Sequence, residues 1–147
     1  MSEVKEQFTV AAIKPENVVY MWPVVKGMLE RAIAHSNGEI TSEGVLKSAI
    51  EGETLLVTIS EEKEVVAAIA IEQRNFDSGL RILNLTLVGG NEMASWMDKF
   101  SEIADNLARD YKCDEIYIIG RPGWVRTLRR LGFEAVHTTV SRKVEAY

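Results

Sequence analysis

Hydrophobic residues recur along the chain at spacings that predict one α/β domain. Near the N-terminus, Phe8–Ile13 predicts a short strand, and Val18–His35 carries apolar residues at helical spacing. A second, shorter helix is expected to end near Ile50, with Thr41 or Ser42 as its N-cap, because a hydroxyl oxygen can accept a hydrogen bond from the first turn. Two helices are therefore expected before the main sheet.

The middle of the chain predicts an antiparallel meander of three strands. These strands are expected at Thr54–Ser60, Glu64–Arg74 and Leu80–Val88, and short polar turns separate them. The second strand is apolar almost without interruption over residues 65–71. Such continuity is typical of a strand that is covered on both faces, so this strand is expected near the middle of the sheet.

Alternation along the third expected strand divides its side chains between two faces. Leu83, Leu85 and Leu87 are expected on one face, and Asn84 and Thr86 on the other. Polar positions within an otherwise apolar strand have two interpretations, contact with a substrate or a solvated face of the sheet. The spacing alone leaves both interpretations open.

The last third of the chain predicts four further elements. A long amphipathic helix is expected from Met93 to Tyr111, followed by a strand at Glu115–Ile119, a short helix at Trp124–Leu131 and a final strand at Phe133–Lys143. With the earlier elements, this order predicts an α/β (α+β) fold in which about four helices flank a mixed, mostly antiparallel sheet.

Composition narrows the classes of protein that fit the chain. At 147 residues with 46% hydrophobic residues, it is expected to form a single domain over residues 1–147. The net charge of −5 makes nucleic-acid binding an unfavoured function, since such binding needs a basic surface. The single cysteine, Cys113, and the charged N-terminus without an apolar run predict a cytoplasmic protein with no membrane span.

The order of elements and one stretch of sequence resemble the GNAT family of N-acetyltransferases. Within Leu107–Phe133, the end of a long helix, the strand Glu-Ile-Tyr-Ile-Ile and a short helix closing on Leu-Gly-Phe match the family's closing pattern. The chain is also similar to the GNAT-like proteins of tailed phages, including internal virion proteins. The resemblance implies acetyl-CoA as cosubstrate and an amine, on a small molecule or a protein, as acceptor. A phage origin would place the chain in the host cytoplasm or the virion.

The resemblance also implies where acetyl-CoA binds. In the family, the strand before the long helix splays from its neighbour and offers backbone groups to the pantetheine arm. The pyrophosphate lies at the helix N-terminus, where N–H groups and the helix dipole stabilise negative charge. The matching segment predicts cofactor contacts from Leu85, Leu87, Val88, Gly89, Gly90, Asn91 and Glu92.

Three positions depart from the family's pattern. Glu92 places a negative charge where the diphosphate approaches, and no arginine or lysine lies between Arg81 and Lys99. Leu128 stands where many of these enzymes carry a tyrosine that protonates the CoA thiolate, and Arg121 stands where an asparagine is often found. The departures support a second hypothesis, that the chain is a catalytically degenerate GNAT-fold protein with a structural or interaction role.

Each candidate catalytic side chain also has a purely structural interpretation. Glu72 is the candidate general base because it ends the apolar run of the central strand. Its structural interpretation is a charged side chain in solvent at the end of a strand. Tyr117 has a hydroxyl that could donate a proton, but a half-buried strand aromatic is expected in the core. The basic helix Arg121–Arg130 is a candidate surface for a protein partner, or a solvated face. No metal-binding motif occurs, so no metal site is expected.

Overall fold

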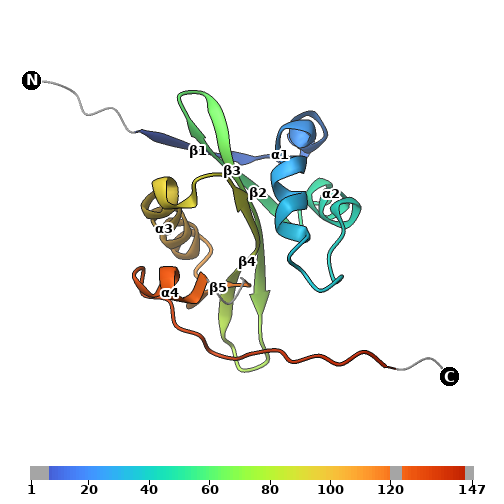
Figure 1. The fold of residues 1–147 in the computed structure, drawn as a ribbon, viewed down its shortest axis with the longest axis vertical. Helices are drawn as coiled ribbons and strands as arrows, with labels where there is room; N and C mark the ends of the chain where they lie inside the picture. The colour runs from blue at the N-terminus through green and yellow to red at the C-terminus, as the bar shows by residue number, and fades with distance from the viewer. Residues whose placement is uncertain (1–6, 120–123, 145–147) are drawn as a thin grey trace, which may run out of the picture.

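The computed structural model describes residues 7–119 and 124–144. A five-stranded sheet forms its centre, and the strands lie across it in chain order (Figure 1). The first four strands are antiparallel to their neighbours and the fifth is parallel to the fourth, which confirms the mixed, mostly antiparallel sheet. The strands are β1 (Phe8–Ile13), β2 (Leu55–Glu61), β3 (Glu64–Asn75), β4 (Arg81–Gly90) and β5 (Glu115–Ile118).

Helices cover both faces of the sheet (Figure 1). One face carries α1 and α2, and the other carries α3 and α4. The α-helices of the described residues are α1 (Val18–Ile33), α2 (Ser42–Ile50), α3 (Met93–Asp110) and α4 (Trp124–Arg129), and a 3₁₀ turn at Pro15–Asn17 leads into α1. Thr41 is the N-cap of α2, since its Oγ1 accepts a hydrogen bond from the backbone N–H of Gly44 at 3.1 Å. None of the helices in these ranges is long and apolar enough to cross a bilayer.

A hydrophobic core lies on each side of the sheet. Trp96 and Phe100 of α3 fill the first core, against strand residues that include Ile69. Leu29 of α1 lies in the second core with Ala70. Consecutive residues of β3 therefore point into different cores, which confirms that this strand is covered on both faces. Full burial of a leucine such as Leu29, which has no exposed surface, stabilises the fold by about 2 kcal/mol.

A β-bulge interrupts the alternation of β4. Ala70 lies opposite Leu87, but the next residue, Ile71, lies opposite Leu85, so Thr86 is the extra residue. As a result, Leu85 packs in the core beneath α3 and Leu87 packs in the core beneath α1. The expectation that Leu85 and Leu87 share a face is wrong, because one inserted residue inverts every side chain beyond it.

The C-terminal segment forms no strand in the part of the chain that the structure describes. The expected strand Phe133–Lys143 is therefore wrong, although Phe133 itself packs against the core. The chain runs past the sheet and away from the body (Figure 1), and its valines stay in solvent, with Val140 89% exposed. A β-forming sequence becomes a strand only where a neighbouring backbone pairs with it, and this segment pairs with no strand among the described residues.

Candidate functional site

The sheet opens between β4 and β5 part of the way along their length. The two strands pair only where Ile82–Leu85 lies beside β5, whereas β4 continues to Gly90. The bulge at Thr86 falls where the pairing stops, and bulges bend the strand that carries them. Among the described residues, the edge of β4 beyond Leu85 therefore has no partner from β5.

A pocket of about 400 Å³ lies beside this opening, within the size range of small-molecule sites. The end of α1, the end of β4, α3 and α4 all contribute to its wall. The lining residues are Arg31, Ala32, Ala34, His35, Val88, Gly89, Gly90, Met93, Trp96 and Trp124. Since α1 and α3 cover opposite faces of the sheet, they can line one pocket only where the sheet is open.

Hydrogen bonds to three other elements hold Asn91, the first residue after β4. Its backbone N–H donates to the carbonyl of Val66 at 3.2 Å, and its own carbonyl accepts from the Trp96 indole at 2.7 Å. Its side-chain Oδ1 accepts a hydrogen bond from Nη1 of Arg31 at 2.9 Å. The loop before α3 is thereby fixed, and a guanidinium group from α1 lies beside it.

Arg31 is the site residue that sequence reasoning missed. The expectation of a loop without nearby positive charge rested on the residues from Arg81 to Lys99, and Arg31 comes from an earlier helix. The hydrogen bond to Asn91 joins positions 60 residues apart, so no local pattern could signal it. The positive charge of Arg31 therefore offsets part of the negative charge that Glu92 brings to the loop before α3.

Glu92 adopts an unusual backbone conformation at the start of α3. Its φ of 50° and ψ of 51° lie in the left-handed region, which costs a non-glycine residue about 1–2 kcal/mol. Its carbonyl accepts hydrogen bonds from the N–H and the hydroxyl of Ser95, at 2.9 and 2.7 Å. Its exposed side chain makes no capping hydrogen bond to α3, and the first turn of the helix contains no acidic residue.

Gly89 and Gly90 lie within β4 rather than in a turn after it. A Cβ atom on Gly89 would lie 2.1 Å from the carbonyl oxygen of Met28 in α1, and one on Gly90 would lie 2.5 Å from that of Val66 in β3. Both distances are far too short for a side chain. The glycines thus allow close packing of α1 and β3 on the strand that forms the pocket wall.

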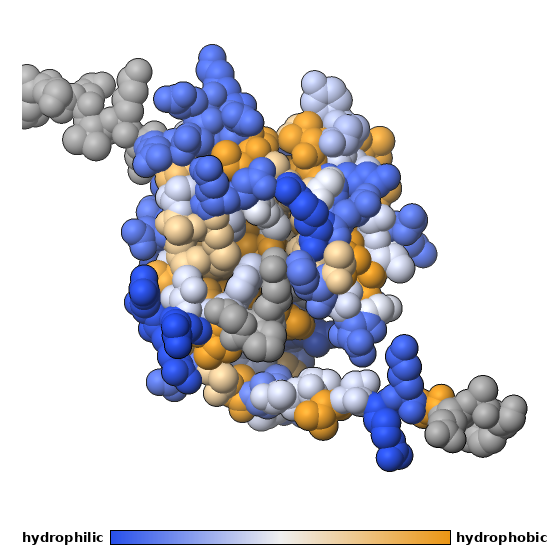
Figure 2. All heavy atoms as spheres, viewed as in Figure 1, coloured by the Kyte–Doolittle hydropathy of each residue, from blue (hydrophilic) through white to orange (hydrophobic). Residues whose placement is uncertain are grey.

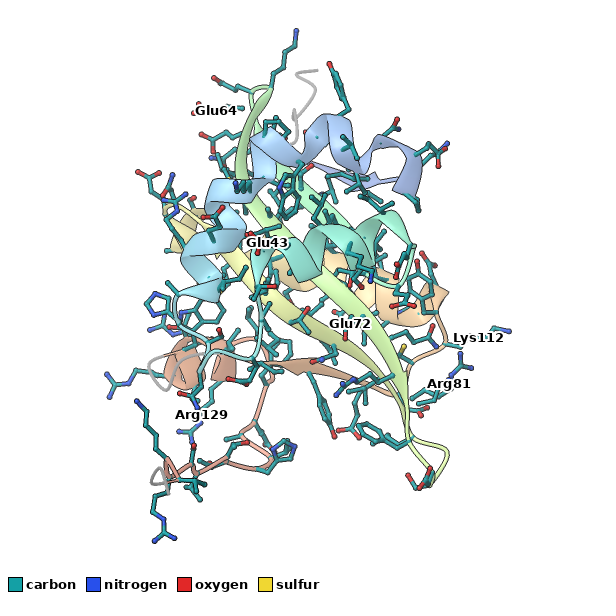
Figure 3. All side chains as sticks on the ribbon, turned by 90° about the vertical axis from the view of Figure 1, so that its right-hand side faces the viewer. Glu43, Glu64, Glu72, Arg81, Lys112 and Arg129 are labelled. Atoms are coloured by element: carbon teal, nitrogen blue, oxygen red, sulfur yellow. The ribbon has the colours of Figure 1, made fainter. Side chains whose placement is uncertain are left out.

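A row of polar side chains crosses the sheet one position before the opening. Glu72 of β3, Asn84 of β4 and Tyr117 of β5 are direct neighbours in the two ladders. They lie on the face that carries α1 and α2, because the adjacent Leu85 packs into the core on the opposite side. Figure 3 views the molecule from this side and labels Glu72.

The members of this row differ in how their polar atoms are paired. Asn84 is only 3% exposed, and its Oδ1 accepts no hydrogen bond from any residue the structure describes. Glu72 is half-buried, and its Oε1 accepts a hydrogen bond of 3.4 Å from Oγ1 of Thr54, which lies 2.6 Å from Oγ of Ser48. The solvated interpretation of Asn84 is therefore wrong, and Glu72 is held in place.

The closing part of the chain contributes packing and exposed charge. Leu128 is buried in the core beneath α3, so an apolar side chain occupies the position of the family's tyrosine. Arg126, Arg129 and Arg130 are exposed (Arg129 is labelled in Figure 3). Arg121 lies outside the described residues.

Solved structures of acetyltransferases share this architecture. An aminoglycoside acetyltransferase from an uncultured soil metagenomic sample is similar with a TM-score of 0.69 at 10% identity, over 99% of this chain and 100% of the other. The glucosamine-6-phosphate N-acetyltransferase of Arabidopsis thaliana gives 0.64 at 11% identity, over 95% and 100%. A predicted acetyltransferase of Clostridium acetobutylicum, solved with acetyl-CoA, gives 0.66 at 11% identity, over 92% and 96%.

Sequence comparisons add nothing to this likeness. No family model and no curated protein sequence matches the chain. The identities to the solved structures are low enough that the likeness establishes the fold and not the activity. The chain has the GNAT fold over nearly its whole length.

Proposed function

We propose that the chain is a GNAT-type N-acetyltransferase, which binds acetyl-CoA in the pocket beside the sheet opening and transfers its acetyl group to an amine. The observation that carries the proposal is the pocket wall. Residues of α1, such as Ala32, and Trp96 of α3 come from opposite faces of the sheet and meet there. A long, narrow cosubstrate can enter the sheet at this opening, with its pantetheine arm along the free edge of β4.

Groups suited to both parts of the cosubstrate lie along the pocket. The edge of β4 after Leu85 offers backbone N–H and C=O groups to the amides of a pantetheine arm. Arg31 and the N-terminal turn of α3 offer positive charge and N–H donors to the phosphates. Glu92 opposes phosphate binding, but its carboxylate is exposed and its field is screened by salt.

Glu72 is the proposed general base. An ammonium acceptor must lose a proton before its nitrogen attacks the thioester carbonyl, and the C–S bond then breaks to release the CoA thiolate. The carboxylate of Glu72 lies one ladder position before the opening and is held by Thr54, and Asn84 presents an unpaired carbonyl oxygen beside it. Both groups accept hydrogen bonds, as recognition of an amine requires.

The buried Leu128 favours a second candidate function. A leucine provides no proton for the departing thiolate, so a chain that has lost turnover could retain the fold and the pocket. In this alternative, the chain is a GNAT-fold structural or interaction protein, of phage origin or otherwise, and the exposed arginines of α4 form its partner surface.

Titration calorimetry with acetyl-CoA, followed by an assay for released thiol with a panel of small amines and amine-bearing peptides, tests the proposal. Binding together with thiol release is the expected result. A ligand at 100 times its dissociation constant also stabilises the fold by about 2.7 kcal/mol, which thermal unfolding detects. Absence of binding at millimolar acetyl-CoA contradicts the proposal, and binding without thiol release from any amine favours the second candidate.

A further inference from the structure

Three aromatic side chains lie at the end of the polar row that contains Glu72. The ring of Tyr117 lies 6.3 Å from the ring of Phe76 and 6.1 Å from that of His137, within the range of about 4.5–7 Å that is typical of packed aromatic pairs. The three residues come from β5, from the turn after β3 and from the segment after α4. We call Phe76, Tyr117 and His137 the ring cluster.

The ring cluster is accessible from solvent. Phe76 is 42% exposed, His137 is exposed and Tyr117 is partly buried. The core beneath α1 and α2 takes Ala70 and Leu87 further along the neighbouring strands, so the ring cluster lies outside that core. Beyond His137 the chain continues away from the rounded body of the molecule (Figures 1 and 2). The rings can therefore contact a bound molecule.

The polar row offers hydrogen-bond acceptors to an amine beside these rings. Oε1 of Glu72 accepts one hydrogen bond, from Thr54, and a carboxylate has room for several more. Oδ1 of Asn84 is buried and accepts a hydrogen bond from no residue that the structure describes. An ammonium group at Glu72 is a donor for both oxygens. Since an unpaired buried acceptor is unfavourable, supplying this donor favours binding.

The charge next to the ring cluster disfavours a second cation in the acceptor. Arg74 lies two residues after Glu72 in β3, so the alternation of the strand places both on the same face. Its exposed positive charge repels the second ammonium group of a diamine. A neutral aromatic ring meets no such repulsion, and it packs favourably against Phe76 and Tyr117.

We propose that the acceptor is an arylalkylamine, whose ammonium group binds Glu72 and whose ring packs against Phe76 and Tyr117. The inference rests on the proposed acetyl transfer, since it names the acceptor. Glu72 and Tyr117 are two strands apart, about 10 Å between backbones, so a short aliphatic linker can join the amine to the ring. In the transfer, Glu72 takes a proton from the ammonium group, the nitrogen forms an amide bond with the acetyl carbon, and the C–S bond breaks to release the CoA thiolate.

Thiol release with phenethylamine, pentylamine and the diamine putrescine tests the inference. The kcat/KM for phenethylamine should be about tenfold higher than for either aliphatic amine. Phe76→Ala should lower kcat/KM for phenethylamine about fivefold, through KM, and leave that for pentylamine unchanged. Tyr111→Ala is the matched control, because Tyr111 is an aromatic residue of nearly equal exposure, 41%, at the end of α3. It should leave both values unchanged.

Calorimetry with phenethylamine distinguishes failure of the inference from failure of the proposed function. In the presence of CoA, which carries no acetyl group, phenethylamine should bind Phe76→Ala about fivefold more weakly than it binds Tyr111→Ala. If this difference holds but no amine releases thiol, the proposed transfer is wrong and the aromatic subsite stands.

Three outcomes would overturn the inference. One is a kcat/KM for pentylamine or putrescine that equals or exceeds the value for phenethylamine. Another is equal affinity of Phe76→Ala and Tyr111→Ala for phenethylamine. The third is absence of phenethylamine binding to the unaltered chain at millimolar concentration.

Discussion

The guanidinium group of Arg31 donates a hydrogen bond of 2.9 Å to the side-chain oxygen of Asn91. Arg31 lies near the end of α1 on one face of the sheet, and Asn91 lies at the end of β4, just before α3. Arg31 lines the pocket, and the bond brings its positive charge to a loop that has only Glu92 as a charged residue of its own. The phosphate end of the proposed cosubstrate site therefore depends on two distant parts of the chain.

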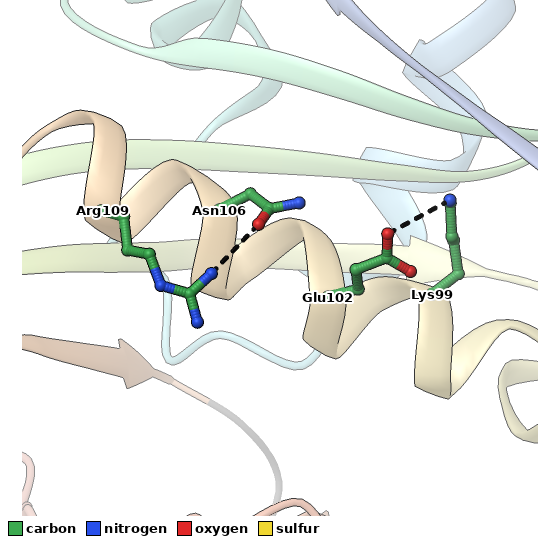
Figure 4. Close-up of polar contacts among 4 residues, drawn as sticks. All are labelled: Lys99, Glu102, Asn106 and Arg109. Carbon is green, nitrogen blue, oxygen red and sulfur yellow. Dashed lines mark hydrogen bonds and ion pairs between the residues drawn. The ribbon is translucent and has the colours of Figure 1, made fainter.

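Arg31→Ala should weaken acetyl-CoA binding by about fivefold to tenfold, because an exposed but charge-assisted contact to phosphate is lost. Titration calorimetry measures this change. The matched control is Arg109→Ala, since Arg109 also donates to an asparagine, Asn106, at 3.2 Å on the outer side of α3 (Figure 4). The control should bind acetyl-CoA as the unaltered chain does.

Equal affinities for the two arginine variants would contradict the role of Arg31. A related check uses desulfo-CoA, which keeps the phosphates and lacks the thiol. Its affinity should fall in Arg31→Ala by the same factor as that of acetyl-CoA, because the contact involves phosphate and not the thioester.

Gly89→Ala should lower the free energy of unfolding by about 2 kcal/mol or more, since the added methyl group meets the backbone carbonyl of Met28 at 2.1 Å. Gly27→Ala is the control, because Gly27 lies in α1 with no atom within 4 Å of the added Cβ. That variant should be more stable than the unaltered chain by about 0.5–1 kcal/mol. Urea unfolding followed by circular dichroism measures both changes, and an undiminished stability of Gly89→Ala would show that α1 does not pack as described.

Glu72→Gln should lower kcat by about a hundredfold with little effect on acetyl-CoA affinity, because the amide cannot take the proton of the acceptor. The assay is thiol release with the best amine of the panel. Glu64→Gln, at the exposed start of the same strand, should retain full activity. If Glu72→Gln keeps its kcat at every pH tested, another group is the base.

The sequence predicts those parts of the fold that repeat at a fixed period. Eighteen residues of α3 place Trp96 and Phe100 in the core at helical spacing, and the continuous apolar run of β3 matches a strand covered on both faces. These elements can be predicted from local pattern, because buried side chains recur at the same spacing along the whole element.

The features that form the site have no such period. The bulge at Thr86 is a register shift against β3, and the contact of Arg31 with Asn91 joins segments 60 residues apart. Both depend on how separate elements pack. After Phe133 local pattern instead predicts an element that is absent from the described residues. The segment has residues that favour strands, but a strand also requires a partner backbone.

The position of acetyl-CoA can be read from the indole N–H signals of the three tryptophans in a ¹H–¹⁵N correlation spectrum. Trp96 and Trp124 line the pocket, whereas Trp22 lies in α1 about 13 Å along the helix from Arg31. Addition of acetyl-CoA should shift the signals of Trp96 and Trp124 and leave that of Trp22 in place. No shift of either pocket indole at saturating acetyl-CoA, or a shift of Trp22 alone, would contradict binding at the sheet opening.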